Sequence, residues 1–322
     1  MPKSSQPIPS RQPIKDLLTI ADLSSRHISA LIKQAKHLKS KRHSGKMPRP
    51  LVGKTLGLIF EKPSTRTRVS FEAGMNHLGG QSLFLEAEKI QLSRGESLSD
   101  TAQVLSGYLD GLVVRTFDQT TLEEWATHAT IPVINGLTDH CHPCQILADL
   151  FTISEKKKRL KGVKLAYVGD GNNVTHSLLE AGARMGMHVS VGCPSGYEPD
   201  QKIVEWSEQE ATKTQATIEV THDPLIAAEN ADVLYTDVWI SMGQEREQKR
   251  RLKALTPYQL NERLLRKAKP GAIVMHCLPA HRGEEISTGA LDGPQSVVLE
   301  QAENRLDMQN AILIDWLGRA SS

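Results

Sequence analysis

The sequence predicts an α/β protein of two domains, each a parallel sheet flanked by helices, with a functional site in the interdomain cleft. Its 322 residues give room for two domains of ordinary size. Short apolar runs alternate with segments of helical periodicity along most of the chain, which is typical of parallel α/β folds. Polar residues repeatedly follow the apolar runs, and open α/β sheets bind ligands outside the carboxyl ends of their strands.

The domain boundary is expected in the charged segment Ser154–Lys161, which has no apolar stripe. The chain then divides into a flexible tail at 1–14, a first domain at 15–153 and a second domain at 154–303. The remaining residues, 304–322, are expected to form a helix that packs back on the first domain. The tail holds prolines, serines and basic residues without an acid, and we interpret it as a frayed end rather than a transit peptide.

Elements of the first half follow from apolar spacing, capping residues and turn signals. The basic run Lys39–Lys46 is interpreted as the solvated end of the first helix rather than as a nucleic-acid site. The expected strands are 56–60, 82–85, 111–114 and 131–134. Two helices are expected at 69–78 and 121–128, and three more are expected to begin at Ser24 or Ser25, at Ser97 or Ser99, and at Pro143.

The second half continues with the same alternation and shows no internal repeat. Its expected strands are 163–168, 189–193, 217–220, 233–235 and 272–275, and its expected helices are 174–185, 203–211, 224–230, 258–267 and 304–317.

The composition is that of a globular protein in water, with 39% hydrophobic and 24% charged residues. No apolar run approaches the roughly 20 residues of a membrane helix, so we expect no membrane association. The formal net charge of +2 gives no reason to expect a nucleic-acid partner. Four dispersed cysteines, Cys141, Cys144, Cys193 and Cys277, indicate a reducing compartment, and we expect a cytoplasmic protein.

The stretch Pro63–Arg68 has the features of an anion site. It lies between the expected strand 56–60 and a helix start, where the first backbone N–H groups lack internal partners and the helix dipole is positive. The alternative is a capped helix with surface arginines. The candidate donors are the hydroxyls of Ser64, Thr65 and Thr67 and the guanidinium groups of Arg66 and Arg68.

The loop Gly169–Asn173 follows a strand and opens a helix, so a dinucleotide site has to be considered. Val174 stands where the G-x-G-x-x-G pattern needs its third glycine, and the next strand is followed by no acid for a ribose hydroxyl. Nicotinamide binding is therefore disfavoured. The amides of Asn172 and Asn173 offer donors and acceptors that suit a zwitterionic substrate.

The segment Asp139–Gln145 contains H-x-H and C-x-x-C, but no second C-x-x-C completes a zinc set, and we expect no metal. His142 and Gln145 at a helix start can instead address a carbonyl oxygen and an amide nitrogen.

Two further strand ends carry polar segments. Asp237–Glu245 is either a plain helix entry or a mobile loop that brings an acid to a substrate amine. His276–Pro279 ends a strand at a turn, and Cys277, taken alone, is more typical of packing than of chemistry.

Taken together, these motifs resemble those of the aspartate/ornithine carbamoyltransferase family, and in particular its ornithine branch, over nearly the whole chain beyond the tail. Ser64–Arg68 resembles the carbamoyl-phosphate loop, and His142–Gln145 resembles the H-P-x-Q motif. Asp237 with 241–243 resembles the D-x-x-x-S-M-G segment of the ornithine branch, and His276–Pro279 resembles its H-C-L-P motif.

The resemblance implies that the chain transfers the carbamoyl group of carbamoyl phosphate to the δ-amine of L-ornithine, giving L-citrulline and phosphate, as in arginine biosynthesis. It implies no cofactor. A related amine acceptor, such as acetylornithine or putrescine, stays open as an alternative. So does a non-catalytic α/β protein that binds a phosphorylated metabolite.

Residue roles are implied by the same resemblance. Gln91 would reach into a neighbouring subunit's site, which implies a homotrimer. The catalytic residues would be Arg115, His142, Asp237, Cys277 and Arg305. Carbamoyl phosphate would be bound by Ser64, Thr65, Arg66, Thr67, Gln91, Arg115, His142, Gln145, Cys277, Leu278 and Arg305, and ornithine by Asn173, Asp237, Ser241 and Met242.

Overall fold

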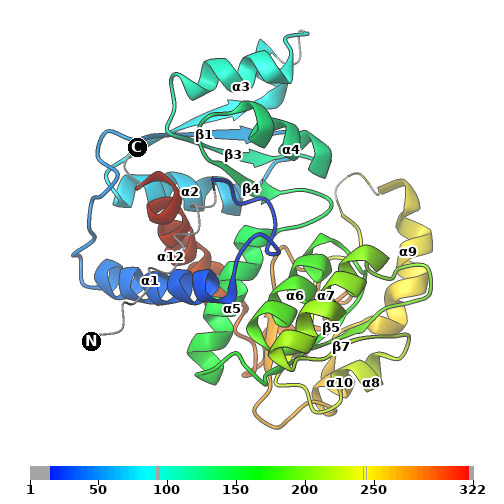
Figure 1. The fold of residues 1–322 in the computed structure, drawn as a ribbon. Coiled ribbons are helices and arrows are strands. Elements are labelled where there is room, and N and C mark those ends of the chain that lie inside the picture. Colours follow the sequence, from blue (N-terminus) through cyan, green and yellow to red (C-terminus); the bar gives the residue numbers. More distant parts are fainter. Residues whose placement is uncertain (1–14, 92–94, 242, 244, 319–322) are drawn as a thin grey trace, which may run out of the picture.

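The chain folds into two lobes, each built on one parallel sheet with helices on both faces (Figure 1). This computed structural model describes residues 15–91, 95–241, 243 and 245–318. The expected tail at 1–14 lies outside the described residues. The predicted fold class is confirmed, whereas the domain boundaries remain a prediction.

The first lobe holds a four-stranded sheet of order β2-β1-β3-β4. Because side chains alternate along a strand, Leu58 and Phe60 pack into the main core while Ile59 joins Ala102 and Trp125 on the opposite face. Its strands are β1 Thr55–Phe60, β2 Gln81–Glu86, β3 Gly111–Arg115 and β4 Val133–Leu137, and its helices are α2 Thr65–His77, η1 Ala87–Lys89, α3 Leu98–Ser106 and α4 Gln119–His128.

The second lobe holds a five-stranded parallel sheet of order β7-β6-β5-β8-β9. The strand order reverses direction beside β5, and ligands of open α/β sheets bind at such a switch point. Its strands are β5 Lys164–Val168, β6 His188–Gly192, β7 Ile218–Thr221, β8 Val233–Thr236 and β9 Ile273–His276. Its helices are α6 Asn173–Met185, α7 Gln201–Thr214, α8 Pro224–Ala228, η3 Glu245–Glu247, α9 Gln248–Leu255, η4 Thr256–Tyr258, α10 Glu262–Leu265 and α11 Thr288–Leu291.

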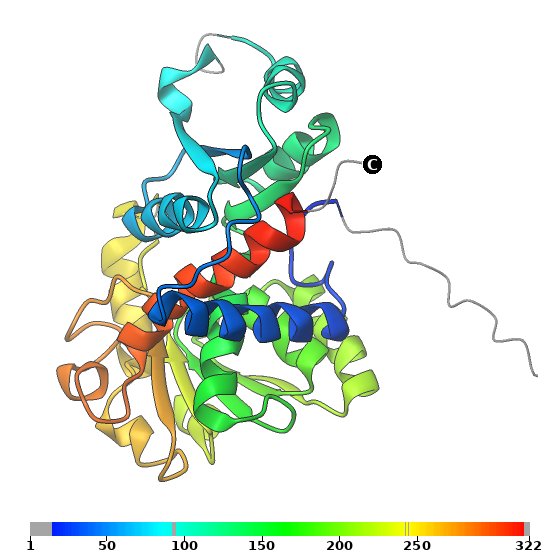
Figure 2. The same cartoon turned by 90° about the vertical axis from the view of Figure 1, so that its left-hand side faces the viewer.

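Three helices connect the lobes: α1 Ser25–His43, α5 Pro143–Lys157 and α12 Val298–Leu317. Figure 2 shows α12 running between the lobes with α1 beside it. Residues of all three helices share one hydrophobic core with strands of both sheets, so the lobes have a common core rather than a thin linker.

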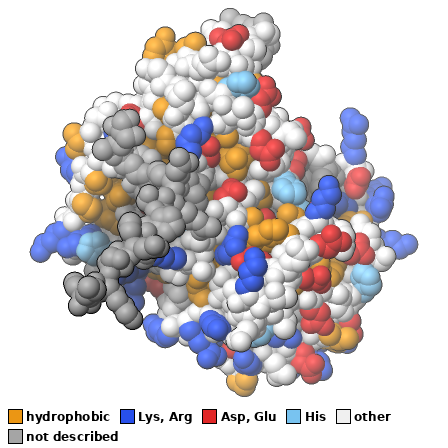
Figure 3. All heavy atoms as spheres, viewed as in Figure 1, with side chains coloured by type: hydrophobic (Ala, Val, Ile, Leu, Met, Phe, Trp, Pro, Cys, Tyr) orange, Lys and Arg blue, Asp and Glu red, His pale blue; other side chains and the backbone are white. Residues whose placement is uncertain are grey.

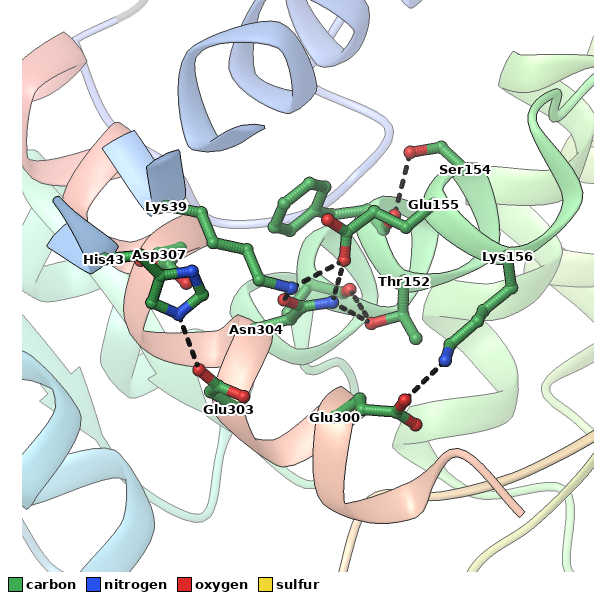
Figure 4. Close-up of polar contacts among 12 residues, drawn as sticks. Lys39, His43, Thr152, Ser154, Glu155, Lys156, Glu300, Glu303, Asn304 and Asp307 are labelled. Carbon is green, nitrogen blue, oxygen red and sulfur yellow. Dashed lines mark hydrogen bonds and ion pairs between the residues drawn. The ribbon is translucent and has the colours of Figure 1, made fainter. Parts of the chain in front are cut away.

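A largely buried polar junction fixes these three helices to one another (Figure 4). Lys39 of α1 donates to Glu155 of α5 at 2.8 Å and to Asn304 of α12 at 2.7 Å. Asn304 in turn donates to Thr152 at 3.0 Å and to Glu155 at 2.9 Å. The residue after Asn304 is Arg305, so this junction sets the rotation of α12 that directs Arg305.

The interpretation of Lys39–Lys46 as a solvated helix end was wrong for part of the run. Besides Lys39, Arg42 donates to both carboxylate oxygens of the buried Asp307, each at 2.9 Å. The partners lie on α5 and α12, more than 110 residues along the chain, so the local pattern contains no sign of them.

The predicted strands are confirmed within a few residues, and the larger errors concern helices. Instead of one helix at 258–267, the chain forms η4 and the short α10. Leu260, between them, is not helical but forms a β-bridge with Ile286, so its backbone makes hydrogen bonds to another part of the chain. The last helix starts at Val298, earlier than expected, and α5 continues to Lys157 through residues that lack an apolar stripe.

No helix among the described residues is long and apolar enough to cross a membrane. Acidic and basic side chains are intermixed over the face shown in Figure 3, in keeping with the small net charge.

The fold explains the glycine at 171, because the backbone of 198–199 passes directly over it. A Cβ atom there would lie 2.3 Å from the nitrogen of Pro199 and 2.5 Å from the carbonyl carbon of Glu198. We therefore expect Gly171→Ala to lower the free energy of unfolding by about 1–3 kcal/mol through overpacking, as measured by urea denaturation.

Gly271→Ala is the matched control, because its new Cβ would meet nothing within 4 Å. We expect it to leave the free energy of unfolding within about 0.5 kcal/mol of the original value. Equal losses in both variants would contradict this steric account of Gly171.

Candidate active site

A cleft of about 460 Å³ lies between the lobes, where the carboxyl ends of both sheets face each other. Side chains at or after the ends of β1, β3 and β4 line one wall, side chains after β5, β8 and β9 line the other, and α12 adds Arg305. The structure brings together thirteen of the residues selected from the sequence: Ser64, Thr65, Arg66, Thr67, Arg115, His142, Gln145, Asn173, Asp237, Ser241, Cys277, Leu278 and Arg305.

Helix α2 supplies the expected anion site. Ser64 is its N-cap, with the backbone N–H of Thr67 donating to the Ser64 hydroxyl at 3.3 Å. The first turn contains no acidic residue, so its positive end is not neutralised from within the helix. Hydroxyls, free N–H groups and the dipole therefore converge at the mouth of the helix, as an anion requires.

Arg66 and Arg68 point to different places. Arg66 lines the cleft and donates from Nη2 to the carbonyl of Leu278 at 2.6 Å, which links the two lobes. Arg68 does not line the cleft; it pairs with Glu72 at 2.9 Å and stacks 3.7 Å above the ring of Phe84. Of the two guanidinium forks suggested by the sequence, only Arg66 is placed to contact an anion in the cleft, because residues two apart on a helix face different sides.

Three further cationic or polar groups are buried around the cleft. Arg115 donates from Nε to the carbonyl of Lys62 at 3.2 Å, and Arg305 donates to Gln145 Oε1 at 3.0 Å and to Thr67 Oγ1 at 2.9 Å. Burial lowers the pKa of Arg115 to about 10, with further lowering by Arg305 and Arg66. The same causes hold the pKa of His142 well below its usual value, so His142 is neutral at pH 7.

His142 is held by its backbone, whose N–H donates to Ser177 Oγ at 2.9 Å. Its buried Nδ1 has no hydrogen-bond partner among the residues that the structure describes. A neutral imidazole can donate from one nitrogen only, so its chemistry here is that of a hydrogen-bond donor rather than of a cation.

The second lobe contributes a carboxylate and a thiol. Cys277 Sγ donates to Asp237 Oδ1 at 2.8 Å, and Asn172 Nδ2 donates to Asp237 Oδ2 at 2.8 Å. Burial, reinforced by the charge of Asp237, raises the pKa of the Cys277 thiol well above its usual value. The thiol therefore keeps its proton near neutral pH and cannot act there as a thiolate.

Asn173 lines the cleft, but its amide donates across the lobes to the carbonyl of Thr138 at 2.6 Å. Asn172, which the sequence singled out only as one of a pair, caps α6 and orients Asp237. The loop 169–173 thus positions the carboxylate of Asp237, and Asn172 within it caps the start of α6.

Two residues that the family resemblance assigns to the site, Gln91 and Met242, are not among the described residues that line this cleft. Gln91 is exposed and lies outside the lining, so its assignment to a neighbouring subunit's site remains a prediction. Met242 lies outside the described residues.

Sequence reasoning missed other lining residues. Lys62 is 3% exposed, forms an ion pair with Asp139 and lies 4.1 Å above the ring of Phe117. Two features of the sequence could have indicated this pair. Lys62 directly precedes the anion loop, and Asp139 directly precedes the H-x-H segment. The lining residues to which the sequence analysis assigned no role are Lys62, Pro63, Leu137, Asp139, Val174, Val238, Ile240, Pro279 and His281.

In the described part of the chain, two groups bring possible metal ligands within 4.8 Å of one another: Asp237, His276 and Cys277, and His281, Glu284 and Glu285. Internal hydrogen bonds account for the first group and for part of the second. The thiol is bonded to Asp237, while His276 accepts from the N–H of Leu278 at 2.8 Å and contacts Glu285 at 3.2 Å.

The fold and the cleft define a class of protein: a two-domain α/β enzyme that binds a phosphorylated anion on one domain and a second, zwitterionic substrate on the other. Models of two family domains match the chain. These are the carbamoyl-phosphate-binding domain of aspartate/ornithine carbamoyltransferases at 15–155 and their aspartate/ornithine-binding domain at 161–315.

Known proteins are similar to this chain over almost its full length. An ornithine carbamoyltransferase of Syntrophus aciditrophicus is 55% identical over 93% of this chain and 98% of its own. An anabolic ornithine carbamoyltransferase of Pyrococcus furiosus is 53% identical over 94% and 96%. A solved ornithine carbamoyltransferase from P. furiosus superposes with a TM-score of 0.93 at 52% identity, covering 96% of this chain and 99% of that one. The chain belongs to the aspartate/ornithine carbamoyltransferase family.

The state of the Cys277 thiol can be measured directly, because the other three cysteines are buried. Since its pKa is raised, we expect alkylation by iodoacetamide to be slower than that of free glutathione at pH 8. The rate should still rise about tenfold per pH unit between pH 8 and 9.

In Asp237→Asn the carboxylate charge that raises this pKa is removed, so alkylation at pH 8 should accelerate. A rate that reaches a plateau below pH 8 in the unchanged protein would contradict the assignment of a protonated thiol.

Proposed function

We propose that this site transfers the carbamoyl group of carbamoyl phosphate to the δ-amine of L-ornithine, giving L-citrulline and phosphate. The observation that carries the proposal is that one cleft unites the anion site of α2 with the Asp237 and Cys277 pair of the opposite lobe. Family membership and relatives named ornithine carbamoyltransferase support the same reaction.

The phosphate end would be bound at the start of α2. Ser64, Thr65 and Thr67 present hydroxyl and backbone donors there, and Arg66 adds a guanidinium fork. Arg115 lies on the same wall, at the end of the strand next to β1. A dianion fits this site because it neutralises several cations at once.

The carbamoyl oxygen would face Arg115, Thr67 and His142. Negative charge develops on that oxygen as the amine attacks, and each preorganised donor is typically worth on the order of 10² to 10³ in rate. Gln145 and the backbone at 277–278 would bind the carbamoyl NH₂, and Arg305 would contact the carbamoyl group.

The amino-acid end of ornithine would be bound by Asn173, Asp237, Ser241 and Met242. A new C–N bond forms between the neutral δ-amine and the carbonyl carbon, the C–O bond to phosphate breaks, and phosphate leaves with the bonding electrons. The amine loses one proton, which the departing phosphate accepts; Asp237 and the protonated Cys277 orient the amine.

Beyond the chemistry, we place the reaction in the direction of citrulline synthesis in arginine biosynthesis, in the cytoplasm. We also infer a homotrimer in which Gln91 completes a neighbouring site. The name of the P. furiosus relative as anabolic supports the direction. The exposed position of Gln91, outside its own cleft, is compatible with a contact across subunits.

Arg66→Ala should raise the KM for carbamoyl phosphate by more than tenfold. The change removes charge-assisted hydrogen bonds of about 1.5–3 kcal/mol each, and 1.4 kcal/mol corresponds to a factor of ten. Steady-state kinetics at saturating ornithine measures the effect.

Arg68→Ala removes the same charge one half-turn away, where the side chain pairs with Glu72 outside the cleft. We expect its KM to stay within about twofold of the original value. Near-normal kinetics in Arg66→Ala, or equal losses in both variants, would exclude the phosphate role.

The acceptor amine is tested by offering ornithine, acetylornithine, putrescine and aspartate with carbamoyl phosphate and measuring the carbamoylated products. We expect citrulline as the main product, because the cleft offers an acid and amides for an amino-acid end. Preferential carbamoylation of acetylornithine or putrescine would move the assignment to that amine.

A further inference from the structure

We propose that Asp149 is a positioning residue that fixes which end of the Gln145 amide faces the cleft, and so makes the site select an acyl phosphate bearing an N–H donor. The inference rests on the proposed function, in which Gln145 binds the carbamoyl NH₂. It adds a specificity determinant that lies behind the cleft lining.

Asp149 is fully buried on α5, one turn after Gln145. Its Oδ1 accepts from Gln145 Nε2 at 2.9 Å and from Gln301 Nε2 at 2.8 Å. Its Oδ2 accepts from the hydroxyl of Tyr235 at 2.8 Å. The carboxylate thus receives three donors from α5, α12 and β8.

An ionised carboxylate can only accept hydrogen bonds, whereas an amide has one accepting and one donating end. Burial raises the pKa of Asp149 to about 6 against the lowering effect of its three donors, so the group is ionised at pH 8. Ionised Asp149 therefore requires the NH₂ end of Gln145. The Oε1 end is left to face Arg305, whose Nη1 donates to it at 3.0 Å.

A carbonyl oxygen has two lone pairs, and Arg305 occupies one of them in this structure. The other can accept from a substrate N–H. Carbamoyl phosphate has an NH₂ group at this place, whereas acetyl phosphate has a methyl group of similar size and the same phosphate end. If Gln145 could turn over, its own NH₂ would face the substrate NH₂ and the preference would be lost.

The test measures dissociation constants at pH 8, without an amine substrate, by calorimetry with carbamoyl phosphate, acetyl phosphate and inorganic phosphate. We expect the unchanged protein to bind carbamoyl phosphate about tenfold more tightly than acetyl phosphate, the size of one hydrogen bond. Asp149→Asn should reduce this preference, because the amide of Asn can meet either end of the Gln145 amide, and it should leave the affinity for inorganic phosphate unchanged. Asp149→Ser, which also lacks the carboxylate, replaces it if the Asn variant does not fold.

Two further variants separate positioning from general destabilisation. Tyr235→Phe removes one donor to Asp149 but keeps the bond to Gln145, so the tenfold preference should persist even if the melting temperature falls. In the double variant Asp149→Asn/Gln145→Ala, the preference for carbamoyl phosphate over acetyl phosphate should fall by the same factor as in Gln145→Ala alone, because Asp149 acts through Gln145.

The inference is overturned if Asp149→Asn keeps the preference, if it weakens phosphate binding equally, or if Tyr235→Phe abolishes the preference as well. Equal binding of both acyl phosphates by the unchanged protein also overturns it, while leaving the transfer reaction intact. Failure of the unchanged protein to bind carbamoyl phosphate at all would instead refute the proposed function, and the inference with it.

Discussion

The crowding of positive charge in the cleft is the constraint on which the rest of the site depends. Arg66, Arg115 and Arg305 have no carboxylate among their hydrogen-bond partners in the described part of the chain; each donates to an uncharged oxygen instead. Their mutual repulsion adds to burial in lowering the pKa values of Arg115 and Arg305. Such an arrangement favours a bound anion, because the anion provides the negative charge that no carboxylate among the described residues provides to these three arginines.

The opposite wall has the complementary character. Its carboxylate, Asp237, is oriented by Asn172 and by the Cys277 thiol rather than by a cation. The Asp237 carboxylate therefore remains available in a cleft whose other lining carboxylate, Asp139, is paired with Lys62. The two walls come from different lobes, so substrate chemistry is divided between them in the same way as the family domains at 15–155 and 161–315.

The sequence was sufficient to predict the strands and the residues at their ends, because both depend on local patterns. Apolar runs identify strands whatever their partners are, and the carboxyl ends of parallel strands necessarily share one edge. Arg68 was misjudged because its direction depends on helix phase and on a distant ring, Phe84. Lys39 was misjudged because its partner Asn304 lies 265 residues away. Asp149 lies only one turn after Gln145, but its burial against Gln301 and Tyr235 comes from α12 and β8, which the local pattern does not show.

Those distant partners form one polar seam between α5 and α12. Gln145, Asp149 and Thr152 follow one another on one face of α5, and they meet Arg305, Gln301 and Asn304 on α12, each at 2.8–3.0 Å. On α5 the spacings of four and three residues place all three side chains on one face, and on α12 Asn304 and Arg305 lie three and four residues after Gln301 and so flank it. The seam therefore consists of three hydrogen-bonded pairs, and the pair nearest the cleft is Gln145 with Arg305.

A seam of this kind fixes register more strictly than an apolar contact would. Turning α12 by one residue would separate all three pairs in a region where Asp149, Thr152 and Gln301 are fully buried. Each buried polar group left without a partner costs about 1–3 kcal/mol, so alternative registers are strongly disfavoured. Leucines at these positions could pack in several ways, with Arg305 pointing in different directions. The polar pairs admit only one arrangement, and in that arrangement Arg305 reaches both Gln145 and Thr67 in the cleft.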